Sequence, residues 1–239
     1  MAQYIYGKNV VKQWILNHNK INRLFLSKEK TDQEINLMAQ KDKLTIVYLT
    51  NKEFERFEGL HQHVVAEIDD FKTYTLKEVT DTLADNALLI VLDGLEDPHN
   101  LGAILRTADA TEVDGVIIPR HGSVKLTPTV AKVSTGAIST VKTIEVVNLT
   151  QTVETLKKQG FWIFGAEFSP KAIDYRKANY KGKVCLVIGS EGKGISPLLL
   201  KHVDVIVKLP MHGQVTSLNA SVSTAVLLYE ILNQRHPLQ

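Results

Sequence analysis

The chain has 239 residues, of which 44% are hydrophobic and 23% charged, a composition typical of a globular protein with one large domain or two small ones. Its formal net charge of +2 is too small to indicate a nucleic-acid partner, so such a partner has to be argued from local features. The lone Cys185 excludes an internal disulfide and predicts a reducing, cytoplasmic environment, and the sequence has neither a signal peptide nor an apolar stretch of the roughly 18 residues that span a bilayer.

Residues 1–72 predict a small α/β domain in which short helices and strands alternate. Apolar residues recur at helical spacing from Val10 to Ile15, and Thr50 with Glu53 predicts a capping box for the segment after it. The other predicted elements, in chain order, are the strand INRLFLS, the helix QEINLMAQKD and the strands LTIVYLT and HVVAEID. Residues 73–84 are polar and charged without a buried strand, so we predict a linker there and a second domain over residues 85–239.

The second domain alternates continuous apolar runs with helical segments. The predicted strands are LLIVLDG, GVIIPR, TIEVVN, FWIFGAEF, KVCLVIGS and DVIVKLPM, and the helices between them include NLGAILRTADATE, PTVAKVSTGAIS, TVETLKKQG and SPLLLKHV. Strands that are apolar throughout are buried on both faces, which predicts a parallel sheet covered by helices on each side. Ligands of such sheets bind beyond the carboxyl ends of the strands, so three strand-end loops are candidate sites.

The first candidate loop comes after the run LLIVLDG. The pair Asp97–Pro98 forces a turn, after which Asn100 either caps the next helix or reaches into a site at the strand end. Arg106 stands about a turn and a half further along the same helix, where it could address the same space. No carboxylate stands one turn before Arg106, so its position indicates a phosphate or carboxylate partner.

The second candidate loop is the glycine-rich VIGSEGKGIS, residues 187–196. It fails the Walker phosphate motif, because Val187 stands at the leading glycine position and Gly194 stands where serine or threonine is needed. It also fails the dinucleotide fingerprint, since Pro197 takes the place of the third glycine. The loop therefore predicts a tight turn whose one carboxylate, Glu191, approaches a ligand without phosphate groups.

The third candidate loop, residues 209–219, connects the last apolar run to a long helix. Ser217 or Asn219 is available as the N-cap of this helix, whose first turn is rich in small polar residues. The apolar residues whose helical spacing predicts a buried face are Val222, Ala225, Val226, Leu228, Tyr229 and Leu232.

Taken in chain order, DPHNLGAILRTADA, LVIGSEGKGIS and LPMHGQVTSLNASVS resemble the three motifs of the SpoU/TrmH family of RNA ribose 2′-O-methyltransferases, in the SPOUT superfamily. The N-terminal part of the chain, beginning with YIYGKNVVKQWI, resembles the ribosomal-protein-like RNA substrate-binding domain of ribosomal members, so the resemblance covers the whole chain. Leu209 stands where isoleucine is common and Ala220 where valine is common, and neither departure removes a functional group.

The resemblance implies an α/β fold in which a parallel-sheet methyltransferase domain with a trefoil knot follows the small N-terminal domain. It also implies a homodimer and a cofactor, S-adenosylmethionine, bound in the knot. The residues that match cofactor-binding positions of the family are Gly189, Leu209, Met211, Ser217, Leu218 and Asn219. Physical reasoning agrees, because adenine needs an apolar slot and backbone hydrogen bonds, and glycine turns permit that approach.

The residues that match the family's catalytic neighbourhood are Asn100, Arg106, Glu191, Ser217 and Asn219. In the implied reaction a ribose 2′-hydroxyl attacks the sulfonium methyl group in line, so the enzyme must position both partners and assist removal of a proton. Because guanidinium stays protonated in proteins, we expect Arg106 to hold the neighbouring phosphate and lower the pKa of the hydroxyl, while phosphate or water receives the proton. The histidines lack metal-ligand spacing, so no catalytic metal is expected.

The function expected from this resemblance is methylation of a guanosine in large-subunit ribosomal RNA. The alternatives are a tRNA ribose 2′-O-methyltransferase and a non-catalytic RNA-binding factor of ribosome assembly. The segment from Lys171 to Lys183 carries five basic residues with Tyr175 and Tyr180, which suits either RNA contacts or a solvated surface loop. The remaining candidates for RNA contact, which a solvated surface explains equally well, are His99, Arg120, Lys125, Lys132 and His212.

Overall fold

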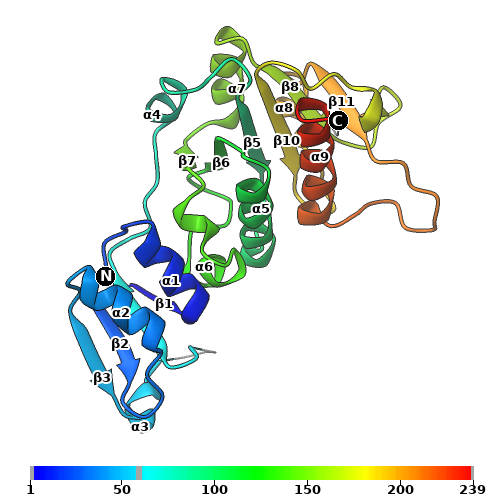
Figure 1. The fold of residues 1–239 in the computed structure, drawn as a ribbon. Helices are drawn as coiled ribbons and strands as arrows, with labels where there is room; N and C mark the ends of the chain where they lie inside the picture. The colour runs from blue at the N-terminus through cyan, green and yellow to red at the C-terminus, as the bar shows by residue number, and fades with distance from the viewer. Residues whose placement is uncertain (1–2, 58–60, 238–239) are drawn as a thin grey trace. The chain divides into compact units, whose positions relative to one another are not determined.

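The computed structural model describes residues 3–57 and 61–237, which form two compact units. One unit contains Met1–Lys72 together with Leu126–Thr140, and the other contains Thr73–Lys125 together with Val141–Gln239. Figure 1 labels the helices and strands of both units. No helix of the described residues is both long enough and apolar enough to cross a membrane.

The first unit is built on a four-stranded sheet in the order β1-β4-β2-β3. Its strands are β1 (Gln3–Tyr6), β2 (Arg23–Ser27), β3 (Ile46–Leu49) and β4 (Val64–Ile68), and its helices include α1 (Lys8–Leu16), α2 (Gln33–Lys41) and α3 (Asn51–Phe54). Strand β4 runs antiparallel to β1 and β2, whereas β2 and β3 are parallel. The predicted first helix is confirmed, since α1 buries its apolar residues from Val10 to Ile15, and the predicted capping box of Thr50 and Glu53 is present at α3.

A segment far along the chain completes this unit. Helix α6 (Pro128–Val133) packs against β1, and the short 3-10 turn η1 (Ala137–Ser139) follows it. Asn17 Nδ2 donates a hydrogen bond of 2.7 Å to Ser139 Oγ. Gly136 has a φ of 95°, and a Cβ atom there would lie 2.6 Å from Cβ of Gln13, so a larger residue would be excluded. Chain order places this segment inside the predicted second domain, and only packing assigns it to the first unit.

The second unit contains a seven-stranded sheet in the order β7-β6-β5-β10-β8-β11-β9, and every neighbouring pair is parallel. The strands are β5 (Leu88–Asp93), β6 (Gly115–Pro119), β7 (Thr143–Val146), β8 (Trp162–Ala166), β9 (Ile173–Asp174), β10 (Val184–Gly189) and β11 (Val205–Lys208). This arrangement confirms the predicted parallel sheet. Strand β10 lies between β5 and β8, which are distant from it in sequence, so the carboxyl ends of β5, β10, β8 and β11 are neighbours.

Helices cover both faces of this sheet. The helices of the second unit are α4 (Leu76–Thr80), α5 (Pro98–Ala110), α7 (Leu149–Lys158), α8 (Pro197–Leu200) and α9 (Ala220–Arg235), with a 3-10 turn η2 (Tyr175–Lys177). Leu89 and Val91 of β5 share a buried cluster with Val153 and Leu156 of α7, whereas α5 and α9 lie side by side and α9 packs on β10 (Figure 1). Residues 73–84, where we predict a linker, contain α4, and Val79 of this helix is fully buried.

Candidate active site

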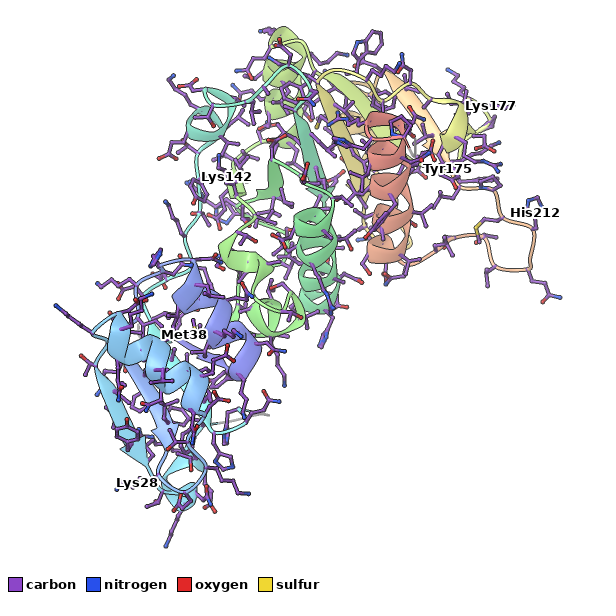
Figure 2. The ribbon with its side chains drawn as sticks, viewed as in Figure 1. Lys28, Met38, Lys142, Tyr175, Lys177 and His212 are labelled. Carbon is purple, nitrogen blue, oxygen red and sulfur yellow. The ribbon has the colours of Figure 1, made fainter. Side chains whose placement is uncertain are left out.

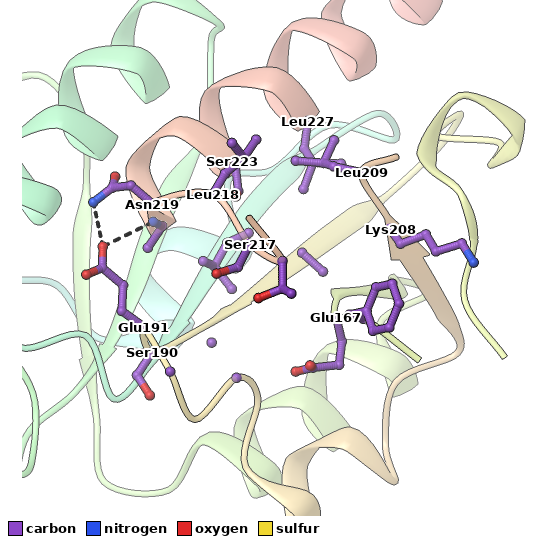
Figure 3. Close-up of a pocket in the computed structure, with 18 of the residues that line it drawn as sticks. Glu167, Ser190, Glu191, Lys208, Leu209, Ser217, Leu218, Asn219, Ser223 and Leu227 are labelled. Atoms are coloured by element: carbon purple, nitrogen blue, oxygen red, sulfur yellow. Dashed lines mark hydrogen bonds between the residues drawn. The ribbon is translucent and has the colours of Figure 1, made fainter. Parts of the chain in front are cut away.

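The site lies at the carboxyl edge of the parallel sheet, where the loops after β8, β10 and β11 surround a cavity of about 720 Å³ (Figure 3). The lining residues are Ala166, Glu167, Phe168, Ile188, Gly189, Ser190, Glu191, Gly192, Gly194, Val207, Lys208, Leu209, Met211, Thr216, Ser217, Leu218, Asn219, Ala220, Ser223 and Leu227. All six residues predicted to bind a cofactor, Gly189, Leu209, Met211, Ser217, Leu218 and Asn219, belong to this wall. The structure therefore brings them to one cavity, and their role in binding stays a prediction.

The glycine-rich loop after β10 forms the tight turn that its sequence predicts. Ser190 and Gly194 exchange two backbone hydrogen bonds of 3.0 and 3.2 Å. Gly192 and Gly194 have φ values of 81° and 66°, a conformation that side-chain-bearing residues rarely adopt. A Cβ atom on Gly189 would lie 2.1 Å from the carbonyl carbon of Gly194, so only glycine permits the loop to fold back onto the end of β10.

A network of side chains joins the first, second and third candidate loops. Oε1 of Glu191 accepts hydrogen bonds from Nδ2 of Asn219 at 2.5 Å and from the backbone N–H of Ala220 at 3.3 Å; Figure 3 shows Glu191 beside Asn219. The same oxygen accepts a hydrogen bond of 3.0 Å from Nδ2 of Asn100. Asn219 Nδ2 also donates to Asn100 Oδ1 at 2.9 Å. The Glu191 carboxylate thus stands at the positive N-terminal end of α9, where a negative charge is stabilised.

The structure decides between the predicted caps. Oδ1 of Asn219 accepts from the backbone N–H groups of Ser221 and Val222, so Asn219, and not Ser217, is the N-cap of α9. Asn100 does not cap α5, because Asp97 is the N-cap and accepts from the N–H of His99. The Asn100 side chain is only 6% exposed and points instead to the network with Glu191.

Arg106 is the one predicted catalytic residue that the structure leaves apart from the cavity. It is exposed on α5, outside the cavity wall, and among the described residues no hydrogen bond or ion pair engages its guanidinium. Six residues along an α-helix correspond to a rotation of about 240° and a rise of about 9 Å, so Arg106 faces a different direction from Asn100. The predicted residues that lie at the cavity or bond to its wall are Asn100, Glu191, Ser217 and Asn219.

Among the wall residues absent from the sequence-based prediction, two come directly after β8. Glu167 and Phe168 directly follow β8, and Oε2 of Glu167 accepts a 2.8 Å hydrogen bond from the backbone N–H of Ile195. A carboxylate immediately after an apolar strand is a signal that the sequence contained. Its relevance depended on β8 lying beside β10, which the order of strands in the chain does not indicate.

The basic segment before β10 proves to be partly buried. Tyr180 is fully buried, its hydroxyl donates to the carbonyl of Tyr175, and burial raises the pKa of Tyr180 well above its ordinary value. The alternative in which Tyr180 contacts RNA is therefore wrong. Tyr175 and Lys177 remain at the surface, and His212 lies at the tip of the loop after β11 (Figure 2).

Helix α9 buries a face that includes the predicted Leu228 but otherwise differs from the predicted one. Its buried residues are Ala220, Thr224, Leu227, Leu228 and Ile231. Val222 and Tyr229, which we expected on a buried face, are 47% and 54% exposed in this chain. The helix is apolar on more than one side, so spacing alone could not identify which stripe faces the sheet.

Two family models match the chain. The SpoU rRNA Methylase family matches residues 87–229, and the RNA 2′-O ribose methyltransferase substrate-binding family matches residues 4–74. The first range contains the cavity and the network of Asn100, Glu191 and Asn219. The second range contains most of the N-terminal sheet and its helices.

Known proteins extend this likeness over nearly the whole chain. A Bacillus subtilis protein named as a TrmH family tRNA/rRNA methyltransferase, YacO, is 39% identical over 98% of this chain and 96% of its own length. A Staphylococcus aureus protein (strain MSSA476) with the same family name is 45% identical over 97% of this chain and 96% of its own. The crystal structure of the SpoU methyltransferase AviRb from Streptomyces viridochromogenes with the cofactor AdoMet shares the fold, with a TM-score of 0.85 at 20% identity over 98% of this chain and 90% of that one. The chain therefore belongs to the SpoU family of RNA ribose 2′-O-methyltransferases, enzymes whose methyl donor is S-adenosylmethionine.

Proposed function

We propose that the cavity at the ends of β8, β10 and β11 binds S-adenosylmethionine and that the enzyme methylates a guanosine 2′-hydroxyl in large-subunit ribosomal RNA. The observation that carries the proposal is the network of Asn100, Glu191 and Asn219 at the wall of this cavity. It unites three loops at the place where a methyl donor and an RNA ribose would meet.

The wall of the cavity suits an adenosine ligand. Ile188, Val207, Leu209 and Leu227 supply apolar surface, and the glycine turn after β10 supplies accessible backbone groups. Among the described residues, the wall has no lysine cluster or glycine-rich helix start for phosphates, which agrees with a ligand that carries none. S-adenosylmethionine supplies an electrophilic methyl group on a positively charged sulfur, and the carboxylate of Glu191 complements that charge.

The network with Glu191 positions the reacting groups in this proposal. Because Glu191 bonds to both asparagines, the amide groups of Asn100 and Asn219 are oriented before RNA binds, which lowers the entropy cost of aligning the ribose hydroxyl. The exposed guanidinium of Arg106 is free to hold a phosphate of the RNA. Its predicted effect on the pKa of the ribose hydroxyl, with phosphate or water as the proton acceptor, stays a prediction, because Arg106 lies outside the cavity wall.

Two further features belong to the proposal. The family fold leads us to propose a trefoil knot around the cavity and a homodimer, and the exposed Val222 and Tyr229 on α9 provide an apolar surface suited to a partner. The N-terminal unit, which matches the substrate-binding family, would hold the RNA. We place the enzyme in the cytoplasm, because its one cysteine is buried and unpaired.

Ribosomal RNA is favoured over tRNA by the family name of the catalytic range, although the relatives are named for both RNAs. The test is methyl transfer from radiolabelled S-adenosylmethionine to purified large-subunit rRNA, small-subunit rRNA and tRNA, with Arg106→Ala as the inactive control. We expect label in large-subunit rRNA, at a guanosine whose 3′ linkage resists alkaline hydrolysis. Label in tRNA alone would establish the alternative tRNA enzyme, and cofactor binding without label in any RNA would contradict the assigned substrates.

A further inference from the structure

Glu167 stands across the cavity from the network that Glu191 organises, and the family motifs do not include it. Figure 3 shows the two carboxylates on opposite sides of the cavity, with Lys208 beyond Glu167. Glu167 directly follows β8, whose neighbours in the sheet are β10 and β11. The cavity is therefore bordered by negative charge on two sides.

One oxygen of Glu167 has a structural role. Oε2 accepts the 2.8 Å hydrogen bond from the N–H of Ile195, and a Cβ atom on Gly194 would lie 2.3 Å from this same oxygen. The carboxylate thus packs directly against the backbone of the glycine-rich loop. Glu167 therefore connects the end of β8 to the loop that carries Glu191.

The other oxygen is available to a ligand. Within the described part of the chain, no hydrogen bond or ion pair reaches Oε1 of Glu167. Lys208, the nearest cation in the wall, has its Nζ atom 5.8 Å from the centre of the Phe168 ring and forms no ion pair with Glu167 among these residues. Because Glu167 is partly buried and lines the cavity, we expect its second carboxylate oxygen to accept hydrogen bonds from the molecule that occupies the cavity.

We propose that Glu167 binds the ribose diol of the adenosine moiety of S-adenosylmethionine. This inference rests on the proposed binding of that cofactor in the cavity. The methyl group has to lie near Asn100, Glu191 and Asn219, so the sulfonium belongs at their side and the rest of the adenosine extends toward β8. The two vicinal hydroxyls are paired donors that a carboxylate accepts, as an acidic side chain after a strand does for ribose in dinucleotide sites.

The diol explains the position of Glu167 better than the other polar groups of the cofactor. The carboxylate of the methionine tail would be repelled by Glu167, and the sulfonium must stay at the opposite side for methyl transfer. Binding of the diol by one oxygen while the other holds the N–H of Ile195 would also couple occupation of the cavity to the order of the glycine-rich loop. Glu167 is thus assigned as a cofactor-binding residue and not as a catalytic one.

The test is calorimetric titration of the full chain and its Glu167→Gln variant with three ligands. Glutamine has the same size and keeps an oxygen acceptor for Ile195, and Glu96→Gln, an exposed carboxylate outside the cavity wall, is the matched control. The ligands are S-adenosylmethionine, S-adenosylhomocysteine, which lacks the sulfonium charge, and 5′-methylthioadenosine, which lacks both that charge and the amino-acid tail. We expect Glu167→Gln to raise all three dissociation constants by a similar factor of at least ten, with an unchanged circular dichroism spectrum and melting temperature.

Each other pattern would overturn the assignment. Weakening confined to S-adenosylmethionine would assign Glu167 to the sulfonium, and weakening of all but 5′-methylthioadenosine would assign it to the ammonium of the tail. Unchanged affinities would remove Glu167 from binding. If the wild type binds none of the three ligands, the cofactor proposal itself fails, so the two failures are distinguishable.

A second experiment tests recognition of the diol by changing the ligand instead of the tail or charge of the cofactor. Adenosine should bind at least ten times more tightly than 2′-deoxyadenosine, and Glu167→Gln should reduce this ratio toward one. Equal binding of both nucleosides by the wild type would contradict recognition of the diol. The pair also separates ribose from adenine, because the two ligands share the base.

Discussion

Glu191 is expected to stabilise the fold as well as the site, and its removal gives a measurable test. The Glu191→Ala change deletes the acceptor of Asn100, Asn219 and the N–H of Ala220. Asn100 and Ala220 are each 6% exposed, so water reaches these two donors poorly, whereas Asn219 is exposed and can turn to solvent.

The magnitude is set by the two buried donors. A buried donor left without a partner costs about 1–3 kcal/mol, so the two together predict a loss of about 2–6 kcal/mol in the free energy of unfolding. We expect a value in the lower half of that range, because the space left by the carboxylate could admit water. Glu191→Gln keeps one acceptor and loses the charge, and a loss of about 1 kcal/mol is expected since charged hydrogen bonds exceed neutral ones by about that amount.

The assay is urea unfolding followed by circular dichroism, with Glu96→Ala as a control at an exposed carboxylate. Both Glu191 variants should lower the unfolding midpoint with an unchanged dependence on urea, and the control should leave it unaltered. Methyl transfer by the folded Glu191→Gln variant should fall by at least tenfold, because the two asparagines lose their orientation. A Glu191→Ala protein as stable as the wild type would refute the idea that this network anchors α9.

Four further predictions concern other parts of the chain. Arg106→Ala should lower turnover by at least about two orders of magnitude while titration shows S-adenosylmethionine affinity near the wild-type value; an equal loss of affinity would contradict its assignment to RNA. Tyr229→Glu, at a side chain 54% exposed, should give a folded monomer in sedimentation velocity, whereas Leu228→Glu, at 0% exposure, should unfold the chain; a folded dimer for Tyr229→Glu would place the interface elsewhere. Arg235→Ala removes the guanidinium that donates to four backbone carbonyls, and it should lower the free energy of unfolding measured in urea by about 2–4 kcal/mol. A loss under about 0.5 kcal/mol, which is typical of an ordinary surface site, would contradict this structural role. Burial and the neighbouring His63 lower the pKa of His61, so the folded state favours the neutral imidazole. The contribution of His61 to the free energy of unfolding is therefore complete above a pH of about 6.5 and is lost as the pH falls below that value. A His61→Gln variant with the same pH dependence of melting temperature would exclude this cause.

Local order in this protein is encoded by short stretches of its sequence. Apolar spacing identified α1, and the short polar sequence from Thr50 to Glu53 identified a capping box, because these features depend on residues within one or two turns of each other. Continuous apolar runs likewise predicted a parallel sheet buried on both faces. The ordered motifs identified the family, because the glycine turn after β10 requires residues without side chains at fixed positions such as Gly189.

The order of the strands was decided only by tertiary structure. Strand β10 inserts between β5 and β8, and this pairing of distant segments makes Glu167 a neighbour of the glycine-rich loop. The segment Leu126–Thr140 joins the N-terminal unit for the same reason, since its partners on β1 are more than a hundred residues away. Such pairings depend on shape and burial across the fold, which local spacing does not encode.

The orientation of single helices was likewise decided by packing. The apolar residues of α9 lie on several sides, so the sheet and α5 determined that Leu228 is buried and Tyr229 exposed. On α5, which packs against α9, Arg106 lies at the surface, whereas Asn100 is buried and bonds to Glu191. The sequence by itself determined which chemical groups this protein carries and the turns that hold them. Packing of the helices and strands of the whole sheet determined which of those groups, such as Asn100, Glu191 and Asn219, contact each other.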